Sequence, residues 1–204
     1  MKVKSSMLSF PDQVRMEGGG EGEPVKIIGY AAKFNSRSNN LGGFVEVIAT
    51  GAFDDVLNDD VRGLFNHDRN MILGRTKSGT LSLSVDDVGL RYEITAPDNQ
   101  TVRDLVLAPI QRGDVDQSSF AFHLPSDGYR WDEDDSGVYI RTITRVSKLI
   151  DVSPVTYPAY NDTEVSARDL EEAKKTLGND SEEQRQLALH QEQQHRDRTL
   201  QTIR

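Results

Sequence analysis

The chain passes from a turn into an extended segment at Gly113-Asp114-Val115-Asp116-Gln117-Ser118-Ser119-Phe120-Ala121-Phe122. Alternate side chains of a strand point to opposite faces, so the rings of Phe120 and Phe122 share one face and Ser119 lies on the other. Large aromatic side chains belong in a core. This stretch therefore predicts a β-sheet that buries its phenylalanine face and carries a serine on the opposite face.

Other extended segments surround this stretch along the chain. β-branched and aromatic residues, which favour strands, gather in five further segments: Val25 to Phe34, Phe44 to Ile48, the hairpin Thr80 to Ala96, Val138 to Val146 and Leu149 to Thr156. One segment between them, Thr101 to Arg112, has apolar residues at roughly helical spacing, and Pro109 limits how far a helix can run. The sequence predicts a mainly β fold with helices, of the α+β class, over residues 25–165.

The two ends of the chain differ from this middle. Residues 1–24 show little apolar periodicity and include Gly18-Gly19-Gly20, whose backbone entropy resists ordering, so we expect a flexible N-terminal lead. Residues 166–204 are rich in helix formers but poor in apolar positions. A helix without an apolar face is marginal in water, so we expect a polar tail that is helical or disordered.

The composition excludes several classes of function. The chain has 204 residues with a net charge of −9 and no dense basic stripe, so nucleic acid is not an expected partner. It contains no cysteine, which excludes disulfides, thiolate metal sites and a cysteine nucleophile. No apolar run is long enough for a membrane span or a secretory signal, and we expect a soluble, intracellular protein. No metal-ligand or phosphate-binding spacing is present, so we expect neither a metal nor an organic cofactor.

The serine at 119 becomes a candidate nucleophile only if a base can take its proton. The candidate base is His67, in Phe65-Asn66-His67-Asp68, about fifty residues earlier in the chain. His123 shares the strand face of Ser119, but four residues of strand separate their Cα atoms by about 13 Å, too far for a direct hydrogen bond. A lone serine and a lone histidine are more often structural, so composition alone does not decide the matter.

A third group should hold the imidazole in one tautomer, and a buried carboxylate does this well. Asp151 lies within the apolar run Leu149-Ile150-Asp151-Val152-Ser153-Pro154-Val155, where a carboxylate needs a partner. We therefore prefer Asp151 to the acids of the polar loops. The alternative is a structural salt bridge from Asp151 to Arg141 or Arg145.

Six motifs of the chain, in this order, resemble those of the tailed-phage prohead protease family, and together they span about Ile27 to Tyr160. They are Gly29 to Asn35, Glu46 to Phe53, Phe65 to Asp68, Leu73 to Thr76, Gly113 to Phe122 and Asp151 to Tyr160. Six motifs in register are far more specific than any one of them. The family is similar in fold to the herpesvirus maturation proteases, so the resemblance implies a small closed β-barrel ringed by helices.

The resemblance also implies a function and a set of site residues. His67 matches the family histidine and Ser119 the family serine, while Asp151 falls on an acidic position of the last motif, where herpesvirus relatives use a second histidine. Ala121 stands where the family commonly has glycine, and Ser118 where it commonly has methionine. The doubled serine therefore leaves the choice of nucleophile open. Oxyanion donors are also open: backbone amides near the serine and the arginines at 141 and 145 are the candidates.

The activity that the resemblance implies is that of a serine endopeptidase of capsid maturation. Its expected substrates are the scaffolding segment of the major capsid protein precursor and the protease itself, inside the assembling prohead in the host cytoplasm. Association into a homo-oligomer is compatible with the sequence. The competing hypothesis is a non-catalytic assembly protein, whose β domain binds capsid subunits and whose tail acts as scaffold.

Overall fold

The computed structural model describes residues 5–10, 14–20, 22–157, 170–171 and 173–177. The chain divides into two compact units, Met1–Thr163 and Glu164–Arg204. In the second unit, residues 170, 171 and 173–177 are helical, and most of the tail predicted over 166–204 lies outside the described residues. In the described part of the chain, no helix combines the length and the apolar character that crossing a membrane requires.

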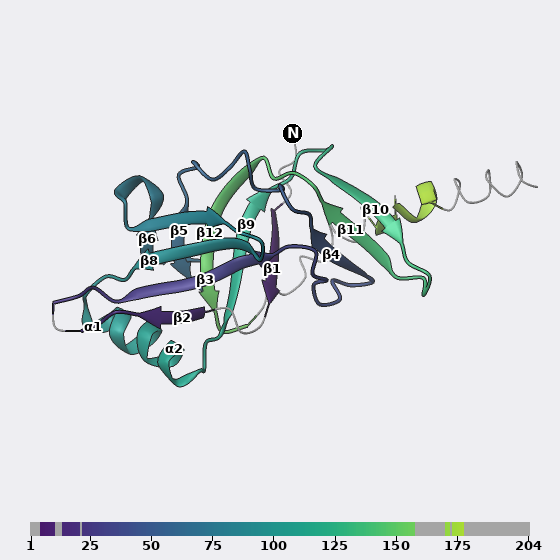
Figure 1. Cartoon of the computed structure of the whole chain (residues 1–204). Coiled ribbons are helices and arrows are strands. Elements are labelled where there is room, and N and C mark those ends of the chain that lie inside the picture. The colour runs from purple at the N-terminus through teal and green to yellow at the C-terminus, as the bar shows by residue number, and fades with distance from the viewer. Residues whose placement is uncertain (1–4, 11–13, 21, 158–169, 172, 178–204) are drawn as a thin grey trace, which may run out of the picture. The chain divides into compact units, whose positions relative to one another are not determined.

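Strands dominate the described part of the first unit, as predicted (Figure 1). They are β1 (Ser5–Phe10), β2 (Val14–Glu17), β3 (Lys26–Lys33), β4 (Phe44–Ile48), β5 (Arg62–Phe65), β6 (Asp68–Arg75), β7 (Leu81–Val85), β8 (Gly89–Thr95), β9 (Gln117–His123), β10 (Tyr129–Glu133), β11 (Tyr139–Ile143) and β12 (Lys148–Val155). One helical stretch consists of α1 (Gln100–Val102), a π-helical turn (Arg103–Leu107) and α2 (Ala108–Arg112), and a 3₁₀ turn covers Thr76–Ser78. The α+β class is confirmed.

The strands form three sheets, with the orders β1-β9-β12-β5-β6, β2-β3-β8-β7 and β10-β11-β4. In the first sheet β9 is antiparallel to both β1 and β12, whereas β12 is parallel to β5. No sheet formed by the described strands closes on itself, because β1 and β6 remain edges of the first sheet. In the described part of the first unit the expected closed barrel is therefore not formed, and a single helical stretch with one 3₁₀ turn stands in place of the expected ring of helices (Figure 1).

The core lies between the first and second sheets and uses the phenylalanine face of β9. Phe120 and Phe122 are fully buried, with ring centroids 4.7 Å apart in a stacked arrangement. Phe53 meets Phe120 edge to face at 5.6 Å. Ile94 of β8 and Val152 of β12 belong to the same cluster. The predicted alternation of β9 is thus the arrangement that the structure adopts.

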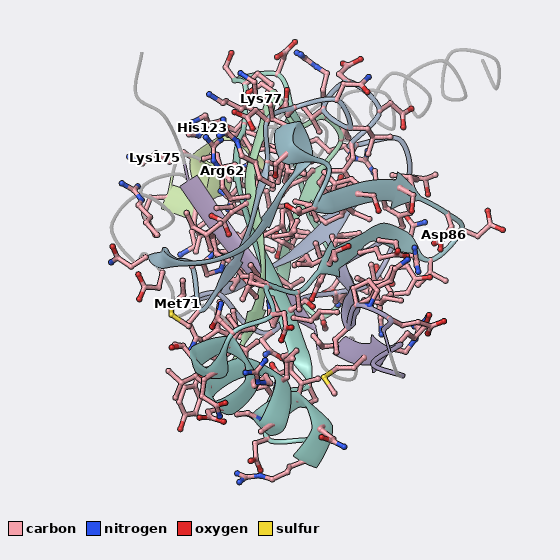
Figure 2. All side chains as sticks on the ribbon, turned by 90° about the vertical axis from the view of Figure 1, so that its left-hand side faces the viewer. Arg62, Met71, Lys77, Asp86, His123 and Lys175 are labelled. Atoms are coloured by element: carbon pink, nitrogen blue, oxygen red, sulfur yellow. The ribbon has the colours of Figure 1, made fainter. Side chains whose placement is uncertain are left out.

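The hairpin predicted over Thr80 to Ala96 forms from β7 and β8. Its turn carries Asp86, which Figure 2 shows at the outer end of the hairpin. One carboxylate oxygen of Asp86 accepts hydrogen bonds from the backbone N–H groups of Val88 and Gly89, at 2.8 and 3.1 Å. An aspartate that bonds its own backbone two residues on is a common turn former, which explains the local signal in the sequence.

Two segments that the sequence suggested as irregular contain strands. The lead over residues 1–24 contributes β1 and β2, and in β2 the half-buried Val14 and Met16 alternate with more exposed neighbours. That short alternation is easily missed beside the glycines that follow it. No strand was predicted between Phe122 and Val138, yet this stretch contains β10, where the alternation of Tyr129 and Trp131 precedes a run of acids.

Candidate active site

Ser119 lies in β9, on the sheet face opposite the phenylalanines. Gly113 ends the preceding helix α2 with a left-handed φ of 79°, which a glycine adopts without steric cost, and β9 begins four residues later. Ser119 pairs in register with Ser153 of β12, and directly opposite residues of an antiparallel pair share a face. Ser119 is fully buried, and its Oγ has no hydrogen-bond partner within the part of the chain that the structure describes.

Ser118, the other serine of the doublet, is engaged elsewhere. Its Oγ lies 2.8 Å from the hydroxyl of Tyr92, and both residues are fully buried. Burial raises the pKa of Tyr92 well above its usual value, so the phenol stays protonated, although its hydrogen bond to Ser118 acts in the opposite direction. Ser118 therefore provides the hydrogen-bond partner of the buried Tyr92 hydroxyl, on the same strand face as the phenylalanines. Of the two adjacent serines, Ser119 is the one whose hydroxyl is not engaged in this way.

His67 lies in the two-residue turn between β5 and β6. Asn66 and His67 both have left-handed backbones, with φ of 53° and 56°. Two such residues in succession make the type I′ turn, whose twist matches that of a hairpin and whose first position favours asparagine. The left-handed region also admits histidine more readily than most side chains. The local sequence thus places the imidazole at the tip of a hairpin, where the turn aims it toward β12.

Asp151 of β12 meets this imidazole, although 84 positions of sequence separate the two residues. The distance from His67 Nδ1 to Asp151 Oδ1 is 2.6 Å, and both side chains are largely buried. An ionised carboxylate only accepts hydrogen bonds, so in a neutral imidazole this contact places the proton on Nδ1 and leaves the lone pair on Nε2. This is the tautomer that a general base requires.

Among the described residues, neither His67 Nε2 nor the buried Oγ of Ser119 has a hydrogen-bond partner. Buried polar groups are nearly always paired in folded proteins, so unpaired ones call for an explanation. These two are the atoms that nucleophilic catalysis by a serine would join. The structure brings His67 and Asp151 together, and it leaves Ser119 on the same sheet without a hydrogen bond to the imidazole.

The structure overturns the alternative of a salt bridge from Asp151 to an arginine. The Arg141 guanidinium instead pairs with Glu46, and both groups are buried. It also lies 5.0 Å from the ring centroid of Phe44, within range of a cation–π contact. Burial raises the pKa of Glu46, an effect that Arg141 counteracts. Arg145 bonds Asp127 at 2.6 Å.

Asn66 is a site residue that sequence reasoning did not single out. Its Oδ1 accepts hydrogen bonds from the backbone N–H and the hydroxyl of Thr156, at 2.8 and 3.2 Å, and its own N–H donates to the carbonyl of Pro154 at 3.0 Å. The histidine turn is thereby fastened to the end of β12. The signal was present in the sequence as an asparagine directly before the histidine of a two-residue turn.

Ser153 is a second site residue that the sequence analysis did not single out. Its Oγ donates to Asp151 Oδ1 at 2.9 Å and lies 3.4 Å from His67 Nδ1. Its place two residues after the aspartate, on the same strand face, was readable from the sequence. His123, which Figure 2 labels, is the last residue of β9, and within the described residues no hydrogen bond joins it to His67.

Residues 12–176 match the family model of the caudovirus prohead serine protease. The chain belongs to this family. It is therefore a serine protease, which confirms the recognition from the six motifs and sets aside the hypothesis of a non-catalytic assembly protein. No curated protein matches the sequence.

The fold of this protease is similar to that of a solved relative. The structure of the capsid assembly protease gp21 of bacteriophage T4 superposes with a TM-score of 0.50, over 78% of this chain and 100% of the other, at 12% sequence identity. A sequence identity this low shows a similarity of fold alone. Within the described residues no group of three or more His, Asp or Glu side chains is arranged to hold a metal ion.

Proposed function

We propose that this protease matures a phage prohead, with Ser119 as nucleophile, His67 as general base and Asp151 as the group that holds the imidazole. The observation that carries the proposal is the 2.6 Å contact between His67 and Asp151. Family membership supports the reaction class, because it makes a serine the expected nucleophile. Of the doubled serines, Ser119 is the one whose hydroxyl is not committed to the core.

The reaction follows from these roles. Ser119 Oγ attacks the carbonyl carbon of the scissile peptide while His67 Nε2 takes its proton, and the imidazolium then passes that proton to the leaving amine. Water, deprotonated by the same nitrogen, hydrolyses the acyl-enzyme and releases the serine. Asp151 remains ionised throughout and stabilises the imidazolium.

Two features of the resting site bear on this mechanism. Nε2 and Oγ must first meet, and hydrogen bonds of catalytic groups often tighten only when substrate is bound. The oxyanion needs donors, and we favour backbone N–H groups beside Ser119, because Arg141 and Arg145 are already engaged by Glu46 and Asp127.

The proposed substrates are the scaffolding segment of the major capsid protein precursor and the protease itself, cleaved inside the assembling prohead in the host cytoplasm. The description of the family and the capsid assembly role of the T4 protease support this choice. Self-processing is expected to end the mature chain between about Tyr160 and Gly178, where the polar tail begins.

The test is co-expression with the capsid protein precursor, followed by mass spectrometry of the products. We expect Ser119→Ala to abolish cleavage of both chains and Ser118→Ala, the matched control one residue away, to preserve it. Asp151→Asn should keep the geometry but favour the wrong tautomer, lowering kcat by about four orders of magnitude. Undiminished processing by the Ser119 variant would refute the nucleophile assignment.

A further inference from the structure

Ser153 occupies a central place in the site. It lies in β12 between two buried residues, Val152 and Pro154, and it is itself fully buried. Its register partner across the antiparallel pair is Ser119, so the two serine side chains share one face of the sheet. Asp151 is two residues earlier on the same strand and therefore shares that face as well.

Ser153 contacts both the proposed acid of the site, Asp151, and the proposed base, His67. Its hydroxyl donates to Asp151 Oδ1 at 2.9 Å, and its Oγ lies 3.4 Å from His67 Nδ1. The same Oδ1 accepts the hydrogen bond from His67 at 2.6 Å. One carboxylate oxygen thus receives two donors, which matches its two lone pairs.

Most buried hydroxyls in folded proteins have a hydrogen-bond partner, and Ser118 shows that the fold can supply one from the core. Ser153 instead bonds the carboxylate that faces the imidazole. The terminal torsion of an aspartate has broad minima, so the side chain alone does not determine which oxygen faces the histidine, or at what angle. A second donor on Oδ1 removes that freedom.

We propose that Ser153 is a positioning residue, which orients the Asp151 carboxylate and through it the His67 ring. This inference rests on the proposed function of the His67 and Asp151 pair. Ser153 takes part in no bond making or breaking. Its hydroxyl holds Oδ1 in line with Nδ1–H, which keeps the lone pair of Nε2 directed consistently as the proton moves.

The kinetic test compares Ser153→Ala with Ser153→Thr, because threonine keeps the hydroxyl and suits a strand. We expect the alanine variant to lower kcat by about tenfold with KM nearly unchanged, since a hydrogen bond to a charged group is lost at a distance from the peptide. The threonine variant should recover most of this loss. Ser147→Ala is the matched control, because Ser147 bonds a backbone carbonyl, that of His123, at 3.0 Å.

A second readout does not depend on proteolysis. In a Ser119→Ala background, the proton on His67 Nδ1 should give a low-field NMR resonance that reports its hydrogen bond to Asp151. We expect Ser153→Ala to shift or broaden this resonance, Ser153→Thr to retain it, and Asp151→Asn to remove it. An unchanged resonance in the Ser153→Ala protein would overturn the positioning role. If Ser119→Ala still cleaved the precursor, the proposed nucleophile would fail, while these spectra would still test Ser153.

Discussion

At the scale of single residues, the site depends on backbone conformations that few side chains accept. Asn66 and His67 both adopt left-handed φ values, and this turns the imidazole toward β12. The carbonyl oxygen of the Asn66 side chain then secures the turn through Thr156. One residue therefore both permits the turn and fixes its position against the strand that carries the acid.

Substitution of Asn66 should separate these two contributions. We expect Asn66→Gly to keep the left-handed turn but lose the hydrogen bonds to Thr156. Asn66→Ala should lose these bonds and also disfavour the turn, at a cost of about 1–2 kcal/mol of unfolding free energy. Both variants should reduce kcat, the alanine variant more strongly. Urea unfolding and peptide cleavage measure the two effects. Equal stability of the glycine and alanine variants would contradict the role of the left-handed turn.

A close contact explains the glycine of the first family motif. A Cβ on Gly29 would lie 2.4 Å from the hydroxyl of Tyr92, which bonds Ser118. We expect Gly29→Ala to displace this phenol and cost about 1–3 kcal/mol, the usual range for overpacking a core. Thermal unfolding measures the loss. The ring carbons of Tyr92 lie almost as close to this Cβ as the hydroxyl does, so Gly29→Ala should cost less in a Tyr92→Leu background, which lacks both. An equal cost in the two backgrounds would place the strain elsewhere.

At the scale of elements, the hairpin of β5 and β6 carries the histidine, and its base is tied down by polar contacts. Arg75 forms two hydrogen bonds with the Asp60 carboxylate. Thr76 accepts from the N–H of Val61 at 2.9 Å and donates to the carbonyl of Asp59 at 2.7 Å. The family motif Leu73-Gly74-Arg75-Thr76 therefore acts structurally, by holding the hairpin at the end opposite the histidine.

The Asp60 and Arg75 pair makes part of the stability of the hairpin depend on pH. Hydrogen bonds from Arg75 lower the pKa of Asp60 from 3.8 to about 2. A carboxyl with a depressed pKa stabilises the folded state above its unfolded pKa, and this contribution is lost as the pH falls from about 4 to about 2. Because the pair is exposed, we expect a small effect. The melting temperature of the wild type should exceed that of Asp60→Asn at pH 5, and the difference should vanish near pH 2.

At the scale of the whole molecule, the fold buries the serine that we propose as the nucleophile. Ser119 has no exposed surface, and its strand lies between β12 on one side and β1 on the other, with Ser9 as its register partner in β1. Substrate must reach a residue flanked by strands on both sides. Of these two neighbours β1 is the edge of the sheet, and it is attached through its pairing with β9.

Removal of residues 1–12 should therefore make the serine more reactive. We expect the truncated protease to react faster with a fluorophosphonate than the full chain does, because the edge of β9 beside Ser119 is open. Mass spectrometry of the labelled protein measures the rate, and Ser119→Ala in both backgrounds controls for labelling at other serines. A labelling rate that is unchanged, in a truncated protein that remains folded, would show that β1 does not restrict access.

Much of the fold could be predicted from local patterns. The alternation in β9 indicated its buried face, and the alternating leucines and hydroxyls of β7 indicated a hairpin. The doubled serine left the choice of nucleophile open. The prediction of a closed barrel was wrong. Closure depends on whether the edge strands β1 and β6 pair with each other, and no local pattern encodes that pairing. β1 and β10 were missed since their pairing with β9 and β11 comes from tertiary context rather than from their own composition.

The sequence by itself determined the residue types of the site and the local conformations that present them. These are a serine on the strand face opposite two phenylalanines, an Asn-His turn and an acid in an apolar strand. Only the tertiary structure decided which of these groups meet. Asp151 could have paired with Arg141 or with His67, and the pairing of β12 with β5 selected the histidine by placing the hairpin tip over the acid. Contacts between residues 84 positions apart depend on strand order and register, which the whole chain sets through its shared core.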